Sequence, residues 1–347
     1  MARTTEPVSV MPEQESVMPE QEDVEVDLDR MTDFRTPWSV HVVVTLRIAE
    51  HLADGRSEIG ELAAAAGCDA DVLGRVLRHL VSVGMFKEPE PGRFGLNVAA
   101  RQLLDPGRRL FLDLDGLGGR MAHAWSTLLT VVRTSKPAYH QLFGRTFWED
   151  LDAHPHLAAA FDAAMGPAGH GTPDPEILLD GDWEVVRSVV DVGGGAGAKL
   201  AAILRVHPEV RGTLVDLPRT VARAAEVFEA AGVSDRATAI GQSFFDPLPS
   251  GADVYLLSSV LNDWPDEETV TILSRCAEAA GPGGRIVVIG GVSPDDSPGE
   301  LSPELVLVGG SDHPLVEFRE LAQRSGLVVV ASGRQPSGRF VVECRAR

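Results

Sequence analysis

The sequence predicts an α/β protein in which a doubly wound, mostly parallel β-sheet follows a smaller, mainly helical module. The first observation is a glycine-rich turn, 193–197, between an apolar run at 188–192 and a helical pattern at 199–205. A strand, a bare turn and a helix N-terminus form a nucleotide-binding unit of a parallel sheet. The second is that apolar runs and helical patterns alternate from this turn to residue 343. The third is a row of amphipathic helices and one hairpin between residues 33 and 96.

Composition limits the partners of this chain. A length of 347 residues suits two domains, and a hydrophobic content of 44% is enough for substantial cores. The net charge of -20 argues against nucleic acid and anionic membranes, which need clustered Lys and Arg. The cysteines, Cys68, Cys276 and Cys344, are far apart, so we expect neither a disulfide framework nor a metal site. Without a signal-peptide pattern or an apolar run near the ~20 residues that span a bilayer, we expect a cytoplasmic protein.

Residues 1–29 are expected to form a disordered acidic leader. They contain Arg3 against nine acids, and the hexapeptide VMPEQE at 10–15 recurs at 17–22. Low hydrophobicity and high charge prevent such a segment from burying a core. A tail that binds a partner is the alternative, and a solvated leader is the interpretation that we favour.

Residues 30–112 are predicted to form a winged-helix module. Gly55 ends the first helix, and Ser57 and Asp69 are placed to cap the next two. Pro91 and Gly92 mark the tip of the hairpin. The expected elements are helices at 33–53, 58–66 and 70–83 and a hairpin at 86–96.

This arrangement leaves a DNA-binding regulator as one alternative function. The helix that would enter the groove offers only Arg75, Arg78 and His79, and the wing is acidic. We therefore favour a dimerisation module without a nucleic-acid partner. Residues 113–180 follow as a helical connector whose aromatic side chains can line a substrate cleft against the nucleotide-binding domain, 181–347.

The nucleotide-binding domain is predicted to contain five parallel strands and a final antiparallel pair. The connection 333–338 is too short for a parallel crossover, so its flanking strands must be antiparallel. The expected strands are 188–192, 212–216, 237–240, 252–257, 285–289, 327–330 and 340–343, with helices at 199–205, 220–231, 267–280 and 313–325.

Two cofactors fit the glycine turn. Gly193, Gly195 and Ala198 satisfy the loose dinucleotide pattern, which leaves a nicotinamide cofactor open. Asp191, just before the glycines, would repel a pyrophosphate but attract the ammonium group of S-adenosylmethionine. Asp216 ends the second strand, where an acid can grip the two hydroxyls of a ribose. We therefore favour S-adenosylmethionine over NAD, whose domains usually end in parallel strands.

Five motifs follow one another in the second half of the chain. They are DVGGGAG at 191–197, TLVDLP at 213–218, SFFDPLP at 243–249, VLNDWPDE at 260–267 and AGPGGRIVV at 280–288. With these motifs, residues 30–347 resemble the bacterial small-molecule O-methyltransferases, above all the subgroup that acts on aromatic polyketides such as anthracyclines.

The resemblance implies a Rossmann-like class I methyltransferase domain with a seven-stranded sheet, behind a winged-helix dimerisation domain. It also implies S-adenosylmethionine as cofactor, a homodimer, and an aromatic or polyketide-type substrate with a hydroxyl group in antibiotic biosynthesis.

By the pattern of this family, each site residue has an expected role. The turn at Gly193 and Gly195, led by Asp191, approaches the methionine part of the cofactor, and Asp216 holds the ribose. For Phe244 and Trp264, ordinary core packing is the alternative. The remaining expected roles are Ser243 and Phe244 beside the adenine, Ser258 at the methionine end, Trp264 against the ring, and Asn262 and Asp263 toward the substrate.

The match breaks at the residues that carry the proton chemistry. Most members of the family have His-Asp-Trp where this chain has Asn262-Asp263-Trp264, and an amide can orient a phenol but cannot take its proton. A glutamate that is common after the fifth strand is Gly290 here. Asp312 and His313 are the remaining candidates for a catalytic part, with helix capping as the alternative role of Asp312.

Loss of the histidine leaves a second function open. The polyketide subgroup contains relatives that keep S-adenosylmethionine but hydroxylate or decarboxylate their substrates. A non-methylating tailoring enzyme on the same scaffold therefore stays beside the O-methyltransferase as an alternative.

Overall fold

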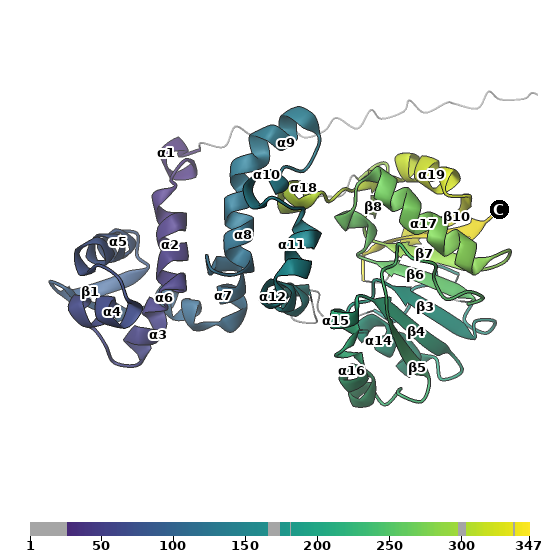
Figure 1. The fold of residues 1–347 in the computed structure, drawn as a ribbon, viewed down its shortest axis with the longest axis horizontal. Coiled ribbons are helices and arrows are strands. Elements are labelled where there is room, and N and C mark those ends of the chain that lie inside the picture. The colour runs from purple at the N-terminus through teal and green to yellow at the C-terminus, as the bar shows by residue number, and fades with distance from the viewer. Residues whose placement is uncertain (1–25, 166–173, 181, 298–302, 336) are drawn as a thin grey trace, which may run out of the picture.

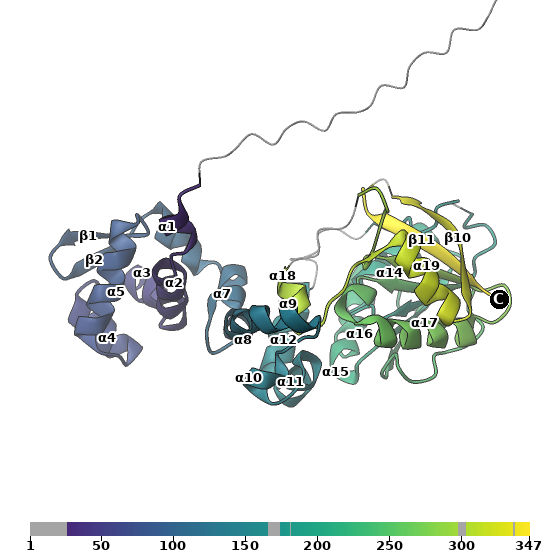
Figure 2. The same ribbon diagram turned by 90° about the horizontal axis from the view of Figure 1, so that it is seen from above.

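The computed structural model describes residues 26–165, 174–180, 182–297, 303–335 and 337–347. Figures 1 and 2 show the helical module and its hairpin at one end, the large sheet at the other, and a group of helices between them. Most of the predicted leader lies outside the described residues. Its last two residues are not irregular as predicted, because Leu28–Met31 form the short helix α1, capped by the carboxylate of Asp27.

The N-terminal module has the predicted order of helices followed by a hairpin, but its first helix is broken. Arg47 takes a left-handed conformation with φ 54°, which ends the hydrogen-bond ladder inside the range 33–53. The new direction buries Ile48 and Ala49 in the core of the module. The elements are α2 (Arg35–Thr45), α3 (Ile48–Ala53), α4 (Ile59–Ala66), α5 (Ala70–Ser82), β1 (Phe86–Glu90), β2 (Arg93–Leu96) and α6 (Val98–Arg101).

One of the two predicted caps is confirmed. Asp69 caps α5 by accepting a hydrogen bond from the Val72 N–H. The cap expected from Ser57 is wrong: α4 starts after Glu58 without a side-chain cap. The reason is that the Ser57 carbonyl accepts from the Phe94 N–H, which joins this segment to the hairpin instead.

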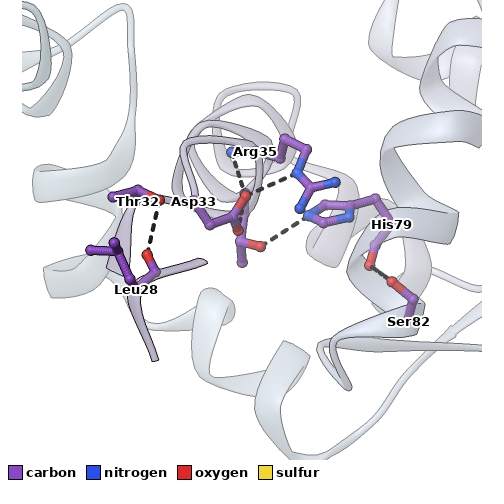
Figure 3. A network of polar contacts seen from close by, with 7 residues as sticks. Leu28, Thr32, Asp33, Arg35, His79 and Ser82 are labelled. Carbon is purple, nitrogen blue, oxygen red and sulfur yellow. Dashed lines mark hydrogen bonds and ion pairs between the residues drawn. The ribbon is translucent and has the colours of Figure 1, made fainter. Parts of the chain in front are cut away.

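A polar network holds the start of α2 against α5 (Figure 3). The Asp33 carboxylate accepts from the N–H groups of Arg35 and Thr36, at 3.1 and 3.2 Å. Hydrogen bonds from the side chains of Thr36 and Arg35, with smaller contributions from these two N–H groups, hold the pKa of Asp33 well below its usual range. The Thr36 hydroxyl lies 2.9 Å from His79 Nε2 on α5. His79 therefore has a hydrogen-bond partner within the module.

The connector between the two ends has its own core. Leu307 of α18 (Pro303–Val308) is fully buried there, beside Tyr139 and Phe147, although it comes from the C-terminal domain of the chain. Figure 1 shows α18 lying against the connector helices. The connector elements are α7 (Pro106–Leu112), α8 (Leu117–Ala124), η2 (Trp125–Thr127), α9 (Leu128–Thr134), α10 (His140–Phe143), α11 (Phe147–Ala153) and α12 (Pro155–Met165).

The C-terminal domain contains the predicted seven-stranded sheet, in the order β10-β11-β7-β6-β3-β4-β5. Only β11 is antiparallel to its neighbours, β10 and β7. The five strands from β7 to β5 in this order pair in parallel. The carboxyl ends of β3, β4, β6 and β7 therefore meet at one edge. The strands are β3 (Ser188–Val192), β4 (Arg211–Asp216), β5 (Ala237–Gly241), β6 (Val254–Ser258), β7 (Arg285–Ile289), β10 (Leu327–Arg334) and β11 (Phe340–Ala346).

Helices cover both faces of this sheet and bury two separate apolar clusters. Two helix predictions need correction. The range 220–231 is divided between α15 (Pro218–Val221) and α16 (Ala224–Ala231). His313 lies in the short strand β9 (His313–Pro314), because its N–H bonds to the Gly291 carbonyl. The other elements are α14 (Ala198–Val206), η3 (Leu261–Asp263), α17 (Asp266–Ala280), β8 (Val292–Ser293) and α19 (Leu315–Arg324).

Candidate functional site

The glycine turn after β3 is shaped by crowding on one side and openness on the other. A Cβ at Gly194 would lie 2.4 Å from the Asp191 carboxylate, and one at Gly197 would lie 2.7 Å from Phe228. Gly193, Gly195 and Gly197 all have positive φ, between 64° and 86°. Nothing lies within 4 Å of the position of a Cβ at Gly195, so the backbone faces open space there. The turn is therefore a cradle in which a ligand can touch main chain.

Asp191 lies beneath this turn and has no exposed surface. Neither of its carboxylate oxygens has a hydrogen-bond partner of good geometry in the described part of the chain. Burial raises the pKa of Asp191 to about 7, although the ammonium group of Lys199 opposes this effect. A carboxylate in this position favours a cation above the turn through its field.

Asp216 stands at the end of β4, beside the same turn. Its Oδ2 accepts from the Gly195 N–H at 2.8 Å and its Oδ1 from the Leu217 N–H at 2.7 Å. Burial raises the pKa of Asp216. The two N–H groups stabilise the charged form and so oppose this rise. A carboxylate has about four lone-pair positions, so two hydrogen bonds orient it and leave acceptors for a pair of hydroxyls.

An aromatic cluster extends from the turn toward the connector. The Phe244 ring is 3.4 Å from the position of a Cβ at Gly193, and the Ser243 hydroxyl accepts from the Phe245 N–H at 3.2 Å. Trp264 meets Phe244 edge-on, with ring centroids 5.8 Å apart. It also stacks on Trp148 of α11, at 5.5 Å and an interplanar angle of 18°. Trp264 thus joins the sheet domain to the connector.

A cavity of about 280 Å³ opens beside this stack. Both domains contribute to it, and most of its wall is aromatic or apolar. One wall residue, Tyr139, is fixed because its hydroxyl donates to the buried Asp150 carboxylate at 2.7 Å, which also pairs with Arg120. A flat aromatic molecule fits such a wall. The lining includes Tyr139, Phe147, Trp148, Asp263, Trp264 and Val308.

Two polar residues, Asn262 and Asp263, stand at one side of the cavity, and Asp263 is part of its wall. The Asn262 side-chain amide donates to Asp263 Oδ1 at 2.8 Å. Burial raises the pKa of Asp263 to about 7, and this hydrogen bond opposes the rise. Ser258 ends β6 just before, and Ser259 takes a left-handed conformation, φ 56°. Such backbone strain in a non-glycine residue is common at functional sites, and Ser259 lies three residues before Asn262.

The structure brings the loop of Asp312 to Asn262 and directs His313 elsewhere. The Ser311 N–H donates to the Asn262 carbonyl at 3.0 Å, and Asp312 follows it, half-buried. His313 is buried, with Nε2 3.8 Å from Asp266 at the start of α17. Neither Ser311 nor Asp312 caps α19, whose N-cap is Pro314.

Sequence reasoning missed two side chains that the structure places at this site. Trp148 lies in the connector, whereas its stacking partner Trp264 comes from a distant motif, so no local pattern pairs the two rings. Arg339 precedes β11 and reaches back to the end of β6, where its Nη2 donates to the Ser259 hydroxyl at 2.8 Å. The antiparallel pairing was a usable signal, because it puts the start of β11 at the carboxyl edge of β7.

The described ranges contain neither a metal-binding cluster nor a membrane-spanning helix. No group of three or more His, Cys, Asp or Glu side chains there is arranged to hold a metal ion. Among the helices that the structure describes, none has the length and apolar character needed to cross a membrane.

Comparison with known families and proteins gives concordant matches. The O-methyltransferase domain matches residues 125–328, and the O-methyltransferase dimerisation domain matches residues 28–106. The 2,7-dihydroxy-5-methyl-1-naphthoate 7-O-methyltransferase of Streptomyces carzinostaticus is 42% identical over 88% of this chain and 94% of its own length. Aclacinomycin 10-hydroxylase of Streptomyces purpurascens is 40% identical over 77% of this chain and 72% of its own.

Solved structures agree with these matches. An O-methyltransferase from neocarzinostatin biosynthesis, crystallised with S-adenosylmethionine and 2-hydroxy-5-methyl naphthoic acid, superposes with a TM-score of 0.80. It is 40% identical, and the match covers 94% of this chain and 100% of that one.

The buried carboxyl group of Asp263 predicts a pH-dependent stability effect. Its pKa in the folded protein, about 7, is above its usual value near 3.8. Between these values the folded state holds the proton and the unfolded state has lost it, so this group's contribution to stability falls as the pH rises from about 4 to about 7. The substitution Asp263→Asn removes this penalty and keeps an acceptor for Asn262.

Urea unfolding of the two proteins measures this effect. We expect the free energy of unfolding of the variant, relative to the unchanged protein, to be greater at pH 8 than at pH 5. A difference that does not change with pH would contradict the burial of an ionisable Asp263.

Proposed function

The chain belongs to the O-methyltransferase family, and from this premise we propose that it transfers the methyl group of S-adenosylmethionine to a hydroxyl group of an aromatic, polyketide-type small molecule. The observation that carries the proposal is the aromatic cavity, whose wall includes Asp263 and Trp264. Trp264 packs on Phe244, which lies against the turn at Gly193, and Asp263 is bonded to Asn262. The naphthoate enzyme of Streptomyces carzinostaticus, at 42% identity, supports a fused-ring substrate and a place in antibiotic biosynthesis.

The residues of the turn fit S-adenosylmethionine. Gly195 leaves main chain open to a ligand, and the buried carboxylate of Asp191 favours the cationic methionine end over a pyrophosphate. Asp216, oriented by two N–H groups, would hold the ribose hydroxyls. Gly193, Ser243 and Phe244 would border the nucleoside, and Ser258 would face its methionine end. When bound, S-adenosylmethionine supplies an activated methyl group.

The residues on the acceptor side orient the substrate and exclude water. Trp148 and Trp264 form a stacked wall that can hold an aromatic ring. The Asn262 amide is fixed by Asp263 and can position the substrate, but it cannot take a proton. Because methyl transfer is an in-line displacement from an activated donor, positioning supplies much of the rate. Asp312 follows Ser311, whose N–H donates to the Asn262 carbonyl, and is our candidate for an acid that assists the reaction.

A second candidate function is a non-methylating tailoring reaction on the same scaffold. Two observations favour it: Asn262 and Gly290 stand where a proton-transfer pair is common in the family, and aclacinomycin 10-hydroxylase is 40% identical. The O-methyltransferase stays first because most of the similar proteins carry methyltransferase names.

A homodimer through the N-terminal module belongs to the same proposal. The module matches a dimerisation domain, and α1 and α2 expose large apolar side chains that a single chain leaves uncovered. Phe34 is the extreme case, with 76% of its surface exposed. Exposed apolar patches of this kind mark association surfaces. The exposed side chains are Leu28, Met31, Phe34 and Trp38.

The two candidate functions are separated by the fate of the methyl group. The full chain is incubated with methyl-labelled S-adenosylmethionine and 1,4-dihydroxy-2-naphthoic acid as a probe acceptor. We expect label in the naphthoate and one S-adenosylhomocysteine for each product, measured by mass spectrometry. An oxygenated or decarboxylated product with the labelled cofactor unchanged would replace the first candidate by the second.

Cofactor binding depends on the charge of Asp216. The substitution Asp216→Asn keeps an acceptor for Gly195 but weakens hydrogen bonds to the ribose, because bonds to a charged acceptor are worth about 1.5–3 kcal/mol. Calorimetry with S-adenosylhomocysteine should show a Kd about tenfold or more above that of the unchanged protein. Asp235→Asn, on an exposed loop, is the matched control and should bind normally. Equal affinity in both variants would remove Asp216 from the site.

The dimer is tested by placing charges on the exposed apolar surface. The double substitution Met31→Asp and Phe34→Asp should give a monomer in size-exclusion chromatography with light scattering, while Val206→Asp, exposed on α14, should leave a dimer. Unchanged protein that elutes as a monomer, or a double variant that stays dimeric, would be inconsistent with this surface.

A further inference from the structure

Arg339 brings a cation to the carboxyl edge of the sheet, where the resemblance leads one to expect an acid. It lies at the end of the β10–β11 connection, just before Phe340, and Val341 pairs with Ile289 of β7. The side chain is half-buried and its Nη2 donates to the Ser259 hydroxyl at 2.8 Å. A guanidinium has five N–H donors, so this bond fixes its direction and leaves others for a ligand.

Gly290 makes room for this guanidinium. A Cβ at Gly290 would lie 3.4 Å from Arg339 Nη2 and 3.5 Å from Asn262 Oδ1. The φ of Gly290 is +86°, which L side chains rarely adopt. The backbone conformation therefore disfavours a side chain at the position that often carries glutamate in the family, while the distances to a Cβ are those of ordinary contact. The amide of Asn262 and the guanidinium of Arg339 flank the space instead.

The charges around Arg339 leave the cation available. Lys199 of α14 is close enough for the two cations to repel, and its ammonium donates to the Asp174 main-chain carbonyl at 3.3 Å. Burial lowers the pKa of Arg339, and Asp174 opposes this effect as the one acid that acts on it. Asp263 bonds to Asn262. Asp174 and the buried Asp191 both act on Lys199, whereas Asp174 alone is among the acids that act on Arg339 in the described chain. Arg339 is therefore the less compensated cation of the two and can bind a further anion.

We propose that Arg339 binds the acceptor oxygen of the substrate as an anion, so that the substrate class is an acidic hydroxyl compound, such as a hydroxyquinone, which is ionised at neutral pH. This inference rests on the proposed methyl transfer and deepens it. Arg339 stands beside Asn262, since both lie against the space at Gly290, and it is also within electrostatic reach of Lys199, which follows the glycine turn. Its positive charge keeps the bound oxygen in the ionised form, so no protein base has to remove the proton.

The chemistry balances without a protein base. The hydroxyl proton leaves to solvent before binding, because the free compound is already ionised. A lone pair of the bound oxyanion forms the new O–CH₃ bond as the S–CH₃ bond breaks, and the electron pair of that bond stays on sulfur. One negative and one positive charge disappear together, and nothing is oxidised or reduced.

Binding experiments test the proposal apart from catalysis. The full chain, saturated with S-adenosylhomocysteine, is titrated with 2-hydroxy-1,4-naphthoquinone, whose coloured anion reports its ionisation, and with neutral 2-naphthol. The variants are Arg339→Gln, Arg339→Lys and Arg334→Gln. Arg334 is the matched control, because it is exposed on the same hairpin and its guanidinium donates to the nearby Gly338 carbonyl at 2.8 Å.

We expect Arg339→Gln to weaken binding of the naphthoquinone anion by about 10- to 100-fold. This is the factor that corresponds to a guanidinium lowering the pKa of the bound hydroxyl by about one to two units. Binding of 2-naphthol should change by less than about twofold, Arg339→Lys should recover part of the anion affinity, and Arg334→Gln should behave like the unchanged protein.

Three results would overturn the inference. The first is that Arg339→Gln binds the anion as tightly as the protein without substitutions, and the second is that the latter does not prefer the anion to 2-naphthol. The third is that Arg339→Gln loses as much affinity for S-adenosylhomocysteine as for the anion, which would assign Arg339 to the cofactor carboxylate. Failure of the proposed function is seen separately, as absence of label transfer by a protein that still binds the anion through Arg339.

Discussion

The hydrogen bond from the Gly195 N–H to the Asp216 carboxylate joins the two strand ends on which the whole site depends. It fixes the turn after β3 to the tip of β4 at 2.8 Å. Gly193, Gly194 and Gly197 are crowded against the side chains of Val260, Asp191 and Phe228, in that order, and this crowding restricts the path of the turn. Side chains at these glycines would force the turn away from Asp216. The cradle for the nucleoside is thus a consequence of missing side chains and of one carboxylate that holds main chain in place.

A second constraint aligns the connector with this turn. Trp148 and Trp264 stack across the boundary between the connector and the sheet domain, and Leu307 of α18 is buried in the connector core. The chain therefore crosses between the two parts more than once. Because the cavity wall is built from both, the shape of the cavity depends on this aromatic packing, which is close-packed and stiff.

Much of the fold was predictable because its signals are local. The glycine turn, Asp216 at the tip of β4 and the antiparallel end of the sheet follow from short stretches of sequence. The cap expected from Ser57 and the helical assignment of His313 were wrong, because tertiary hydrogen bonds to Phe94 and to Gly291 prevailed over the local patterns. Arg339 was missed because its partners, Ser259 and the space at Gly290, are far away in the sequence. The roles of the cofactor and substrate residues stay predictions.

The acceptor side carries the most distinctive feature of this chain, an amide and a guanidinium where proton-transfer groups are common. The central claim is that the turn receives S-adenosylmethionine with its reactive end toward this pair. A crystal structure with S-adenosylhomocysteine and 2-hydroxy-1,4-naphthoquinone tests it directly. The account predicts ribose hydroxyls on Asp216, the quinone against Trp148 and Trp264, and its ionised oxygen within hydrogen-bond distance of Arg339. A nucleoside bound away from Asp216, or a quinone bound outside the aromatic cavity, would contradict it.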